Sequence, residues 1–243
     1  MYEQHKKKKK RKKRKKKLPK EIIVLPNADK AFQEKWYPGR DELNIPHSFR
    51  AIFCGPPGSG KSMMVKNLIM RADPPFEEIY VIHCDPDGTS EYDDIEPTSM
   101  LENIPAPSEW PGLVKTLVIC DDIDYHSMDK TQLKNLSRLM GYVGTHKNIS
   151  VIIAQQDSFQ IPSIARRCAN LFVFWKSHDM DSLARAATKT GMKSSSLNNI
   201  FKGLMHNPHD SLWIDLTKDS PMPLRKNGYT PITRSEDIKD VFH

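Results

Sequence analysis

The stretch CGPPGSGKS at residues 54–62 constrains the fold more than any other part of the sequence. It joins a short apolar run, FRAIFC at 49–54, to a segment from Lys61 to Arg71 that has apolar side chains on one helical face. Glycines at such a junction let the backbone turn tightly. Several N–H groups, and the positive end of the helix, can then face one phosphate chain. The strand–loop–helix order therefore predicts a phosphate-binding loop in an α/β domain.

The residues of this loop have expected roles toward ATP. We expect Lys61 to contact the β- and γ-phosphates and Ser62 to hold Mg²⁺. The loop expected to bind the nucleotide comprises Gly55, Pro56, Pro57, Gly58, Ser59, Gly60, Lys61 and Ser62. Kinases, GTPases, transporters, helicases and DNA motors all use such loops, so the class of protein has to be inferred from other residues.

Apolar runs and helical patterns alternate along the rest of the chain. The sequence predicts further strands at 77–83, 115–122, 149–156 and 169–176, helices at 130–142 and 179–190, and a terminal hairpin at 211–216 and near Leu224. The polar, proline-rich stretch 85–112 predicts an irregular connection. This alternation predicts a mostly parallel central sheet flanked by helices.

The run LVICDD at 117–122 supplies two carboxylates at the end of a predicted strand. Four apolar residues place the strand in the core, so Asp121 emerges at its carboxyl end, where a magnesium-ordering carboxylate belongs. Asp122 can polarise a water for attack on the γ-phosphate. Asp124 can be a helix cap.

The next predicted strand, VIIAQQD, ends in the two amides Gln155 and Gln156. A buried glutamine has to be hydrogen-bonded. We therefore expect one of the two to have a partner at the strand tip and the other to be solvated.

In this order, GPPGSGKS, LVICDD, HKNISVIIAQQD and IARRCANLFVFWKSHD resemble the FtsK/HerA-type viral genome-packaging ATPases. They are most similar to the poxvirus-type packaging ATPases of large DNA viruses, virophages and Polinton-like elements. The resemblance covers residues 48–190 and implies a P-loop NTPase fold of the RecA/FtsK-HerA type. It implies that the strand at 149–156 lies between the loop strand and the Asp-Asp strand, with Gln156 as a sensor beside the γ-phosphate. Asp122 stands where the wider superfamily commonly has the longer Glu.

The resemblance also implies an ATPase that drives double-stranded DNA into a viral capsid. Such motors are homo-oligomeric rings, commonly hexamers, and the capsid vertex is the expected partner. A neighbouring subunit supplies an arginine finger, for which Arg138, Arg166 and Arg167 are candidates; the last two match the family's basic position before the fifth strand. The implied location is the nucleus or virus factory of an infected host, or the virion.

Three other classes of protein share some of these features. A HerA-like helicase or translocase in repair or conjugation shares the motifs. The expected absence of a large added domain, and the closeness of the fourth- and fifth-strand segments to the packaging ATPases, favour packaging. A small-molecule P-loop kinase predicts an arginine-rich lid and no paired glutamines on a central strand. A binding scaffold with a vestigial loop is opposed by the intact Lys61, Ser62, Asp121 and Asp122.

Residues 6–17 read KKKKKRKKRKKK and carry the whole excess of positive charge. Removing these twelve from the 37 basic residues leaves 25 against 30 acidic ones, a balance of −5. Like charges with nothing apolar to bury predict a disordered polybasic tail at 1–17, before an extended lead-in at 18–47 and one domain at 48–243. The tail suits nucleic-acid binding, nuclear import or capsid docking.

Two other classes are excluded by composition. No stretch of eighteen or more apolar residues occurs, so no transmembrane helix is expected. No apolar segment follows the basic start, so no signal peptide is expected.

Overall fold

The structure is a computed structural model that describes residues 40–112, 114–177, 180, 184, 188, 191, 193–217 and 220–232. The predicted polybasic tail and most of the predicted lead-in lie outside the described residues, as does most of the helix predicted at 179–190. Within the described part of the chain, no helix has the length and apolar character needed to cross a membrane.

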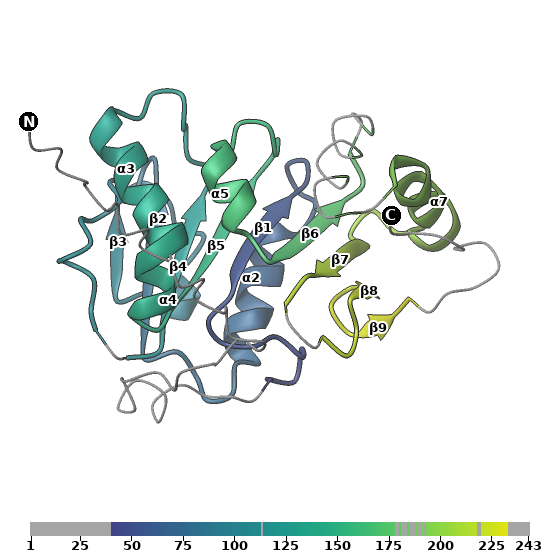
Figure 1. Cartoon of the computed structure of the whole chain (residues 1–243), viewed down its shortest axis with the longest axis horizontal. Coiled ribbons are helices and arrows are strands. Elements are labelled where there is room, and N and C mark those ends of the chain that lie inside the picture. The colour runs from purple at the N-terminus through teal and green to yellow at the C-terminus, as the bar shows by residue number, and fades with distance from the viewer. Residues whose placement is uncertain are drawn as a thin grey trace, which may run out of the picture.

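One sheet organises the described residues, with nine strands in the order β3-β2-β4-β5-β1-β6-β7-β8-β9 (Figure 1). The strands are β1 (Arg50–Cys54), β2 (Glu78–His83), β3 (Ser99–Leu101), β4 (Thr116–Asp121), β5 (Ile149–Gln155), β6 (Leu171–Trp175), β7 (Ser211–Asp215), β8 (Leu224–Lys226) and β9 (Thr230–Pro231). Neighbouring strands are parallel from β3 to β6 and antiparallel from β6 to β9. The predicted fold class, an α/β fold with a mostly parallel sheet, is confirmed.

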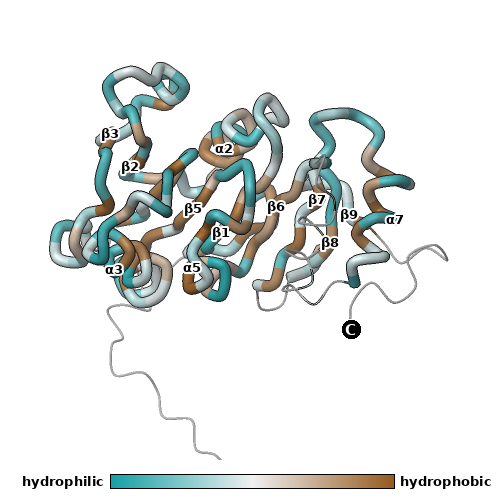
Figure 2. Tube along the Cα trace, turned by 90° about the horizontal axis from the view of Figure 1, so that it is seen from above, coloured by the Kyte–Doolittle hydropathy of each residue, from teal (hydrophilic) through white to brown (hydrophobic). Residues whose placement is uncertain are grey.

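Helices cover both faces of this sheet. They are α2 (Lys61–Met70), α3 (Lys130–Arg138), α4 (Gly144–His146), α5 (Ser163–Cys168) and α7 (Ser194–Leu204), with a 3-10 turn at Asp93–Ile95 and a π-helical turn at Leu139–Val143 between α3 and α4. Seen from above, α2 lies on one face of the sheet and α3 and α5 lie on the other (Figure 2). The two buried clusters agree, because one contains Val65 of α2 and the other contains Leu136 of α3 and Ala165 of α5.

The central strands are buried on both faces, which explains their continuous apolar runs. Every residue of β4 and β5 is buried. β5 pairs with β1 on one side and with β4 on the other, in a register that sets Cys54 beside Gln155 and Asp121 beside Ala154. The carboxyl ends of these three strands therefore meet at one edge of the sheet. The order β4-β5-β1 is the one that the resemblance implies.

The segment 85–112 is more ordered than its composition predicts. It contains the 3-10 turn and β3, which adds a parallel edge strand beside β2. β3 has only three residues, too few to show a period in the sequence. The helix α5 has six residues, which is also too short for a helical period to be recognised in the sequence.

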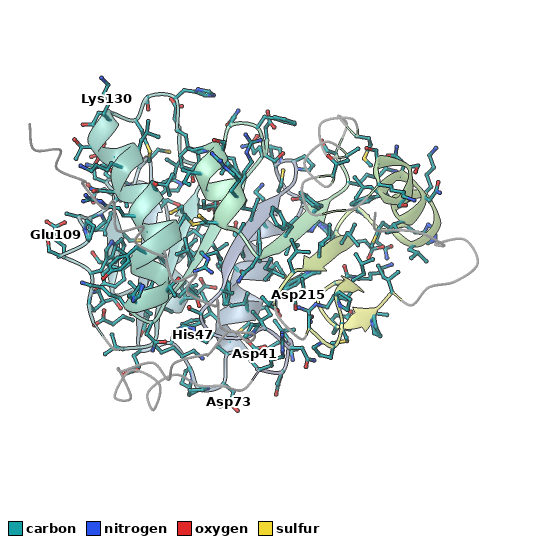
Figure 3. The ribbon with its side chains drawn as sticks, viewed as in Figure 1. Asp41, His47, Asp73, Glu109, Lys130 and Asp215 are labelled. Atoms are coloured by element: carbon teal, nitrogen blue, oxygen red, sulfur yellow. The ribbon has the colours of Figure 1, made fainter. Side chains whose placement is uncertain are left out.

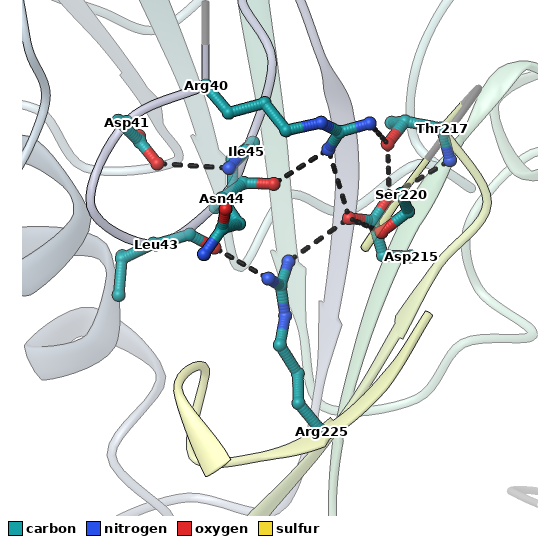
Figure 4. A network of polar contacts seen from close by, with 9 residues as sticks. All are labelled: Arg40, Asp41, Leu43, Asn44, Ile45, Asp215, Thr217, Ser220 and Arg225. Atoms are coloured by element: carbon teal, nitrogen blue, oxygen red, sulfur yellow. Dashed lines mark hydrogen bonds and ion pairs between the residues drawn. The ribbon is translucent and has the colours of Figure 1, made fainter. Parts of the chain in front are cut away.

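A buried ion-pair network ties the first described residues to the last strands (Figure 4). Oδ2 of Asp215 lies 3.2 Å from Nη2 of Arg225 and 3.5 Å from Nη1 of Arg40. Arg225 is fully buried and also donates to the carbonyl of Leu43 at 2.6 Å. The segment 40–45 is thereby fixed to the end of the sheet formed by β7 and β8.

The edge where β1 begins carries polar contacts that serve the fold. Asp41, His47 and Asp73 lie together there (Figure 3). The ring nitrogens of His47 lie 3.0 Å from the carbonyl oxygen of Asn148 and 2.8 Å from the hydroxyl of Ser150. Burial lowers the pKa of His47 to about 4, so the neutral ring joins the lead-in to the start of β5.

Candidate active site

The connection from β1 to α2 requires glycine at three positions. Gly58 and Gly60 have φ angles of +69° and +102°, a region that residues with a side chain rarely adopt. At Gly55, a Cβ atom would lie 2.8 Å from both Ser59 Oγ and Trp175 Cβ. The loop therefore closes tightly against β6, and its glycines are dictated by shape.

Lys61 begins α2 and turns its ammonium group back over the loop. Its Nζ donates to the carbonyls of Gly55 at 3.0 Å and Pro56 at 3.3 Å, and the residue is 7% exposed. No side chain caps the start of α2, so its first N–H groups and positive dipole end are available. A buried ammonium beside an uncapped helix start is suited to an anionic polyphosphate.

Asp121 is the last residue of β4 and is 3% exposed. The hydroxyl of Tyr92 donates to its Oδ2 at 2.8 Å. Burial raises the pKa of the Asp121 carboxyl to about 6; the hydrogen bond from Tyr92 opposes this shift, and the charge of Asp122 adds to it. With a pKa of about 6 the carboxyl is half ionised near that pH and mostly ionised at neutral pH.

Asp122 and Gln156 meet just beyond the ends of β4 and β5. Asp122 leaves the strand direction with a φ of +43° and is only half-buried. Nε2 of the exposed Gln156 donates to Oδ2 of Asp122 at 3.3 Å. Gln155 is the buried amide, and its Nε2 donates to the carbonyl of Ile123 at 3.0 Å and to Oε1 of Gln160 at 2.9 Å. Both glutamines therefore have partners at the strand tip, and they differ in burial, since Gln155 is buried and Gln156 is exposed.

These groups share one cavity of about 360 Å³ at the carboxyl edge of the sheet. It is lined by Pro57, Gly58, Gly60, Lys61, Ser62, Met63, Lys66, Glu91, Asp121, Asp122 and Gln156. Gly55, Pro56 and Ser59 belong to the loop without lining the cavity. The structure therefore brings together the loop, both carboxylates and the glutamine that the sequence predicts to act as one site.

A larger neighbouring cavity of about 450 Å³ has different chemistry. Its lining includes Glu102, Asp124 and Asp129 but neither lysine nor arginine among the described residues. Without a cation it is unsuited to a polyphosphate.

Some residues at or near the site lie outside the sequence motifs, so the sequence did not predict them. Glu91 lines the cavity and Tyr92 reaches Asp121, although both lie in the segment predicted to be irregular. His209, in the turn before β7, has Nδ1 3.2 Å from the carbonyl oxygen of Ser59. These contacts join residues 29 and 150 positions apart, so no local pattern in the sequence marks them.

The three arginine-finger candidates do not line the cavity. Arg138 and Arg167 are exposed. Arg166 is half-buried, with its guanidinium carbon 5.5 Å from the centre of the Phe159 ring. Its Nε and Nη1 have no hydrogen-bond partner among the described residues. The cavity of one chain thus lacks an arginine from these positions.

The residues present fit a magnesium ion. Ser62 and Asp121 line the same cavity, and both interact with the hydroxyl of Tyr92. Mg²⁺ is usually held by one or two protein oxygens together with phosphates and water. The described residues contain no group of three or more His, Cys, Asp and Glu side chains that could cage a metal. One hydroxyl and one carboxylate beside a phosphate-binding loop therefore supply the small number of protein oxygens with which Mg²⁺ is usually bound.

Three features define the P-loop NTPase fold: a glycine loop between β1 and α2, an acidic pair at the end of β4, and a strand order in which β5 lies between β4 and β1. No protein-family model matches the sequence, and no curated protein matches it.

Solved structures with this fold are similar to the chain. The genome-packaging NTPase B204 of Sulfolobus turreted icosahedral virus 2, in complex with sulfate, has a TM-score of 0.55 at 15% identity, covering 79% of this chain and 100% of B204. Its AMPPCP complex gives 0.54 at 13% identity, covering 77% and 100%. The pCW3 conjugation coupling protein TcpA gives 0.50 at 13% identity, covering 71% of this chain and 59% of TcpA. At these identities the likeness establishes the fold alone.

Proposed function

We propose that this protein is an ATP-driven double-stranded DNA translocase that packages a viral genome into a capsid. The observation that carries the proposal is the single cavity in which Lys61, Asp122 and Gln156 meet. Phosphoryl transfer to water needs cations on the transferred group and a positioned nucleophile, and this cavity has residues for both. The motif order of poxvirus-type packaging ATPases, and the likeness of the fold to a packaging NTPase, support packaging as the task.

The loop is proposed to hold the β- and γ-phosphates of ATP. Lys61 would exchange its bonds to the carbonyls of Gly55 and Pro56 for bonds to phosphate oxygens. A phosphate oxygen carries negative charge whereas a carbonyl oxygen is neutral, so the ammonium gains Coulombic attraction in the exchange. The N–H groups and dipole at the start of α2 would act on the same phosphates.

Ser62 and Asp121 are proposed to hold Mg²⁺. When bound, the ion would neutralise charge on the β- and γ-phosphates. Asp121 has to be ionised for this role, which the raised pKa of about 6 permits at neutral pH.

Asp122 is proposed as the base that polarises the attacking water. Its half-exposed carboxylate faces the solvent of the cavity, in contrast to the buried Asp121. Gln156 orients this carboxylate through the 3.3 Å hydrogen bond and lines the same cavity. A residue that touches both the base and the cavity suits a sensor of the γ-phosphate.

A homo-oligomeric ring, most simply a hexamer, is proposed to complete the site. Arg166 and Arg167 lie on α5 and Arg138 ends α3, and none of them lines the cavity of its own chain. The Nε and Nη1 atoms of Arg166 are buried and have no hydrogen-bond partner among the described residues, so this side chain would have to turn outward to reach a phosphate of a neighbouring chain. An arginine finger from a neighbouring subunit would stabilise the charge of the transition state.

Double-stranded DNA is the proposed track of the motor. The twelve bases at 6–17 would attract it without regard to sequence. Nuclear import and docking on a capsid vertex are the other proposed uses of this tail. The protein would act in the nucleus or virus factory of an infected host, or with the virion, in a large DNA virus, a virophage or a Polinton-like element.

A HerA-like helicase or translocase in DNA processing is the second candidate. The likeness of the fold to a conjugation coupling protein favours it. ATP turnover should be measured with no DNA, with linear duplex and with forked DNA, for the wild type and for Lys61→Ala. Packaging predicts turnover that duplex DNA stimulates and that the variant loses. Strand separation of the fork would favour the second candidate, and turnover indifferent to DNA would reject both.

A further inference from the structure

Tyr92 connects the two halves of the proposed magnesium site. Its hydroxyl donates to Oδ2 of Asp121 at 2.8 Å, and the hydroxyl of Ser62 is a second polar neighbour. Asp121 ends β4 and Ser62 lies in the first turn of α2, so one side chain reaches both elements. Within the described residues, this is the one hydrogen bond that the Asp121 carboxylate accepts.

The side chain of Tyr92 is held firmly in place. It is 1% exposed and belongs to the buried cluster that contains Val65 of α2 and Ile119 of β4. Two residues further on, Asp94 forms an ion pair with Lys66 of α2 at 2.7 Å. A buried ring and an ion pair therefore fix this segment against α2.

A fixed donor on one oxygen determines how the carboxylate is turned. The terminal torsion of an aspartate is broad when nothing restrains it. With Oδ2 bonded to Tyr92, the other oxygen of Asp121 is left for the cavity that the residue lines. Partners that orient a metal ligand in this way commonly change metal affinity when removed.

We propose that Tyr92 is a positioning residue of the magnesium site, whose hydroxyl fixes the Asp121 carboxylate and whose ring links β4 to α2. Tyr92 does not line the cavity, so it acts through Asp121 and Ser62. This inference rests on the proposed function, because it requires the cavity to bind Mg·ATP.

Tyr92→Phe tests the proposal, since it removes the hydroxyl and keeps the buried ring. The binding of a fluorescent ATP analogue should be titrated with Mg²⁺, and in parallel with EDTA. The Mg²⁺ concentration that gives half-maximal tightening should rise about 10–100-fold. Binding in EDTA should stay within about twofold of the wild type, because the loop is unaltered.

Tyr80→Phe is the matched control. The Tyr80 hydroxyl donates to Glu78 at 2.7 Å on β2, away from the cavity. Its removal should leave the Mg²⁺ requirement unchanged. In an Asp121→Asn background, Tyr92→Phe should add little, because both changes act on one interaction.

A wild-type Mg²⁺ requirement in Tyr92→Phe would overturn the proposal, even if the variant unfolds at a lower temperature. An equal loss of affinity for the ATP analogue with Mg²⁺ and in EDTA would also overturn it. Tyr92 would then support the phosphate-binding loop and not the orientation of the Asp121 carboxylate. Failure of the wild type to bind the nucleotide with Mg²⁺ would remove the proposed function, and this inference with it.

Discussion

Gly55→Ala should damage both the stability of the domain and its phosphate loop. The added Cβ would lie 2.8 Å from Ser59 Oγ and from Trp175 Cβ. Trp175 is 1% exposed on β6, with its ring 5.8 Å from that of Phe53, so it cannot yield without moving a strand. Overpacking of this kind costs about 1–3 kcal/mol. We expect the free energy of unfolding to fall by that amount.

Denaturant unfolding and nucleotide binding measure the two effects. Each kcal/mol lost should lower Tm by about 2–4 °C for a domain of this size. ATP should also bind more weakly at temperatures where the variant is folded, because the clash displaces the loop whose N–H groups are proposed to face the phosphates. Gly203→Ala is the control: it meets no atom within 4 Å and lies in α7, so stability should rise by up to about 1 kcal/mol. Equal stability and equal nucleotide binding in Gly55→Ala and the wild type would show that the loop does not close tightly against Trp175.

Asp122→Asn should still bind Mg·ATP but hydrolyse it at least about a hundredfold more slowly in single-turnover assays; loss of binding instead would make Asp122 a ligand or a structural residue. Mg²⁺-dependent nucleotide binding should weaken as the pH falls through about 6, because the raised pKa of Asp121 means that its carboxyl takes up a proton there; a requirement that stays flat down to pH 5 would contradict this. Subunits with Lys61→Ala mixed with subunits with Arg166→Ala should recover ATPase activity, because some interfaces then join an intact loop to an intact arginine; no recovery removes Arg166 as a finger acting in trans. Deleting residues 1–17 should flatten the slope of log K against log salt for duplex binding by roughly five, if half of the twelve charges contact phosphates; an unchanged slope favours import or docking.

The central sheet could be predicted because its signals are local. The loop glycines and the apolar run before them mark β1 and α2, and the fully buried β4 and β5 read as continuous apolar strands. The meeting of Lys61, Asp121 and Gln156 follows, since parallel strands present their carboxyl ends at one edge.

The rest of the site depends on contacts that no local pattern encodes. Tyr92 lies in a polar stretch, and its burial results from docking on α2 and β4. His209 reaches Ser59 across 150 residues of sequence. The partners of the buried Gln155, the carbonyl of Ile123 and the side chain of Gln160, also come from the folded chain. The contacts of these residues can be identified only from the three-dimensional structure.

Movement along duplex DNA is the most direct test of the central claim. A triplex-forming oligonucleotide, placed on a long linear duplex, should be displaced by the wild-type protein when ATP is added. Lys61→Ala should not displace it, because the loop then lacks the cation over its phosphates. We expect displacement that depends on ATP and on Lys61. A wild-type protein that hydrolyses ATP in the presence of duplex DNA and leaves the triplex in place would contradict it.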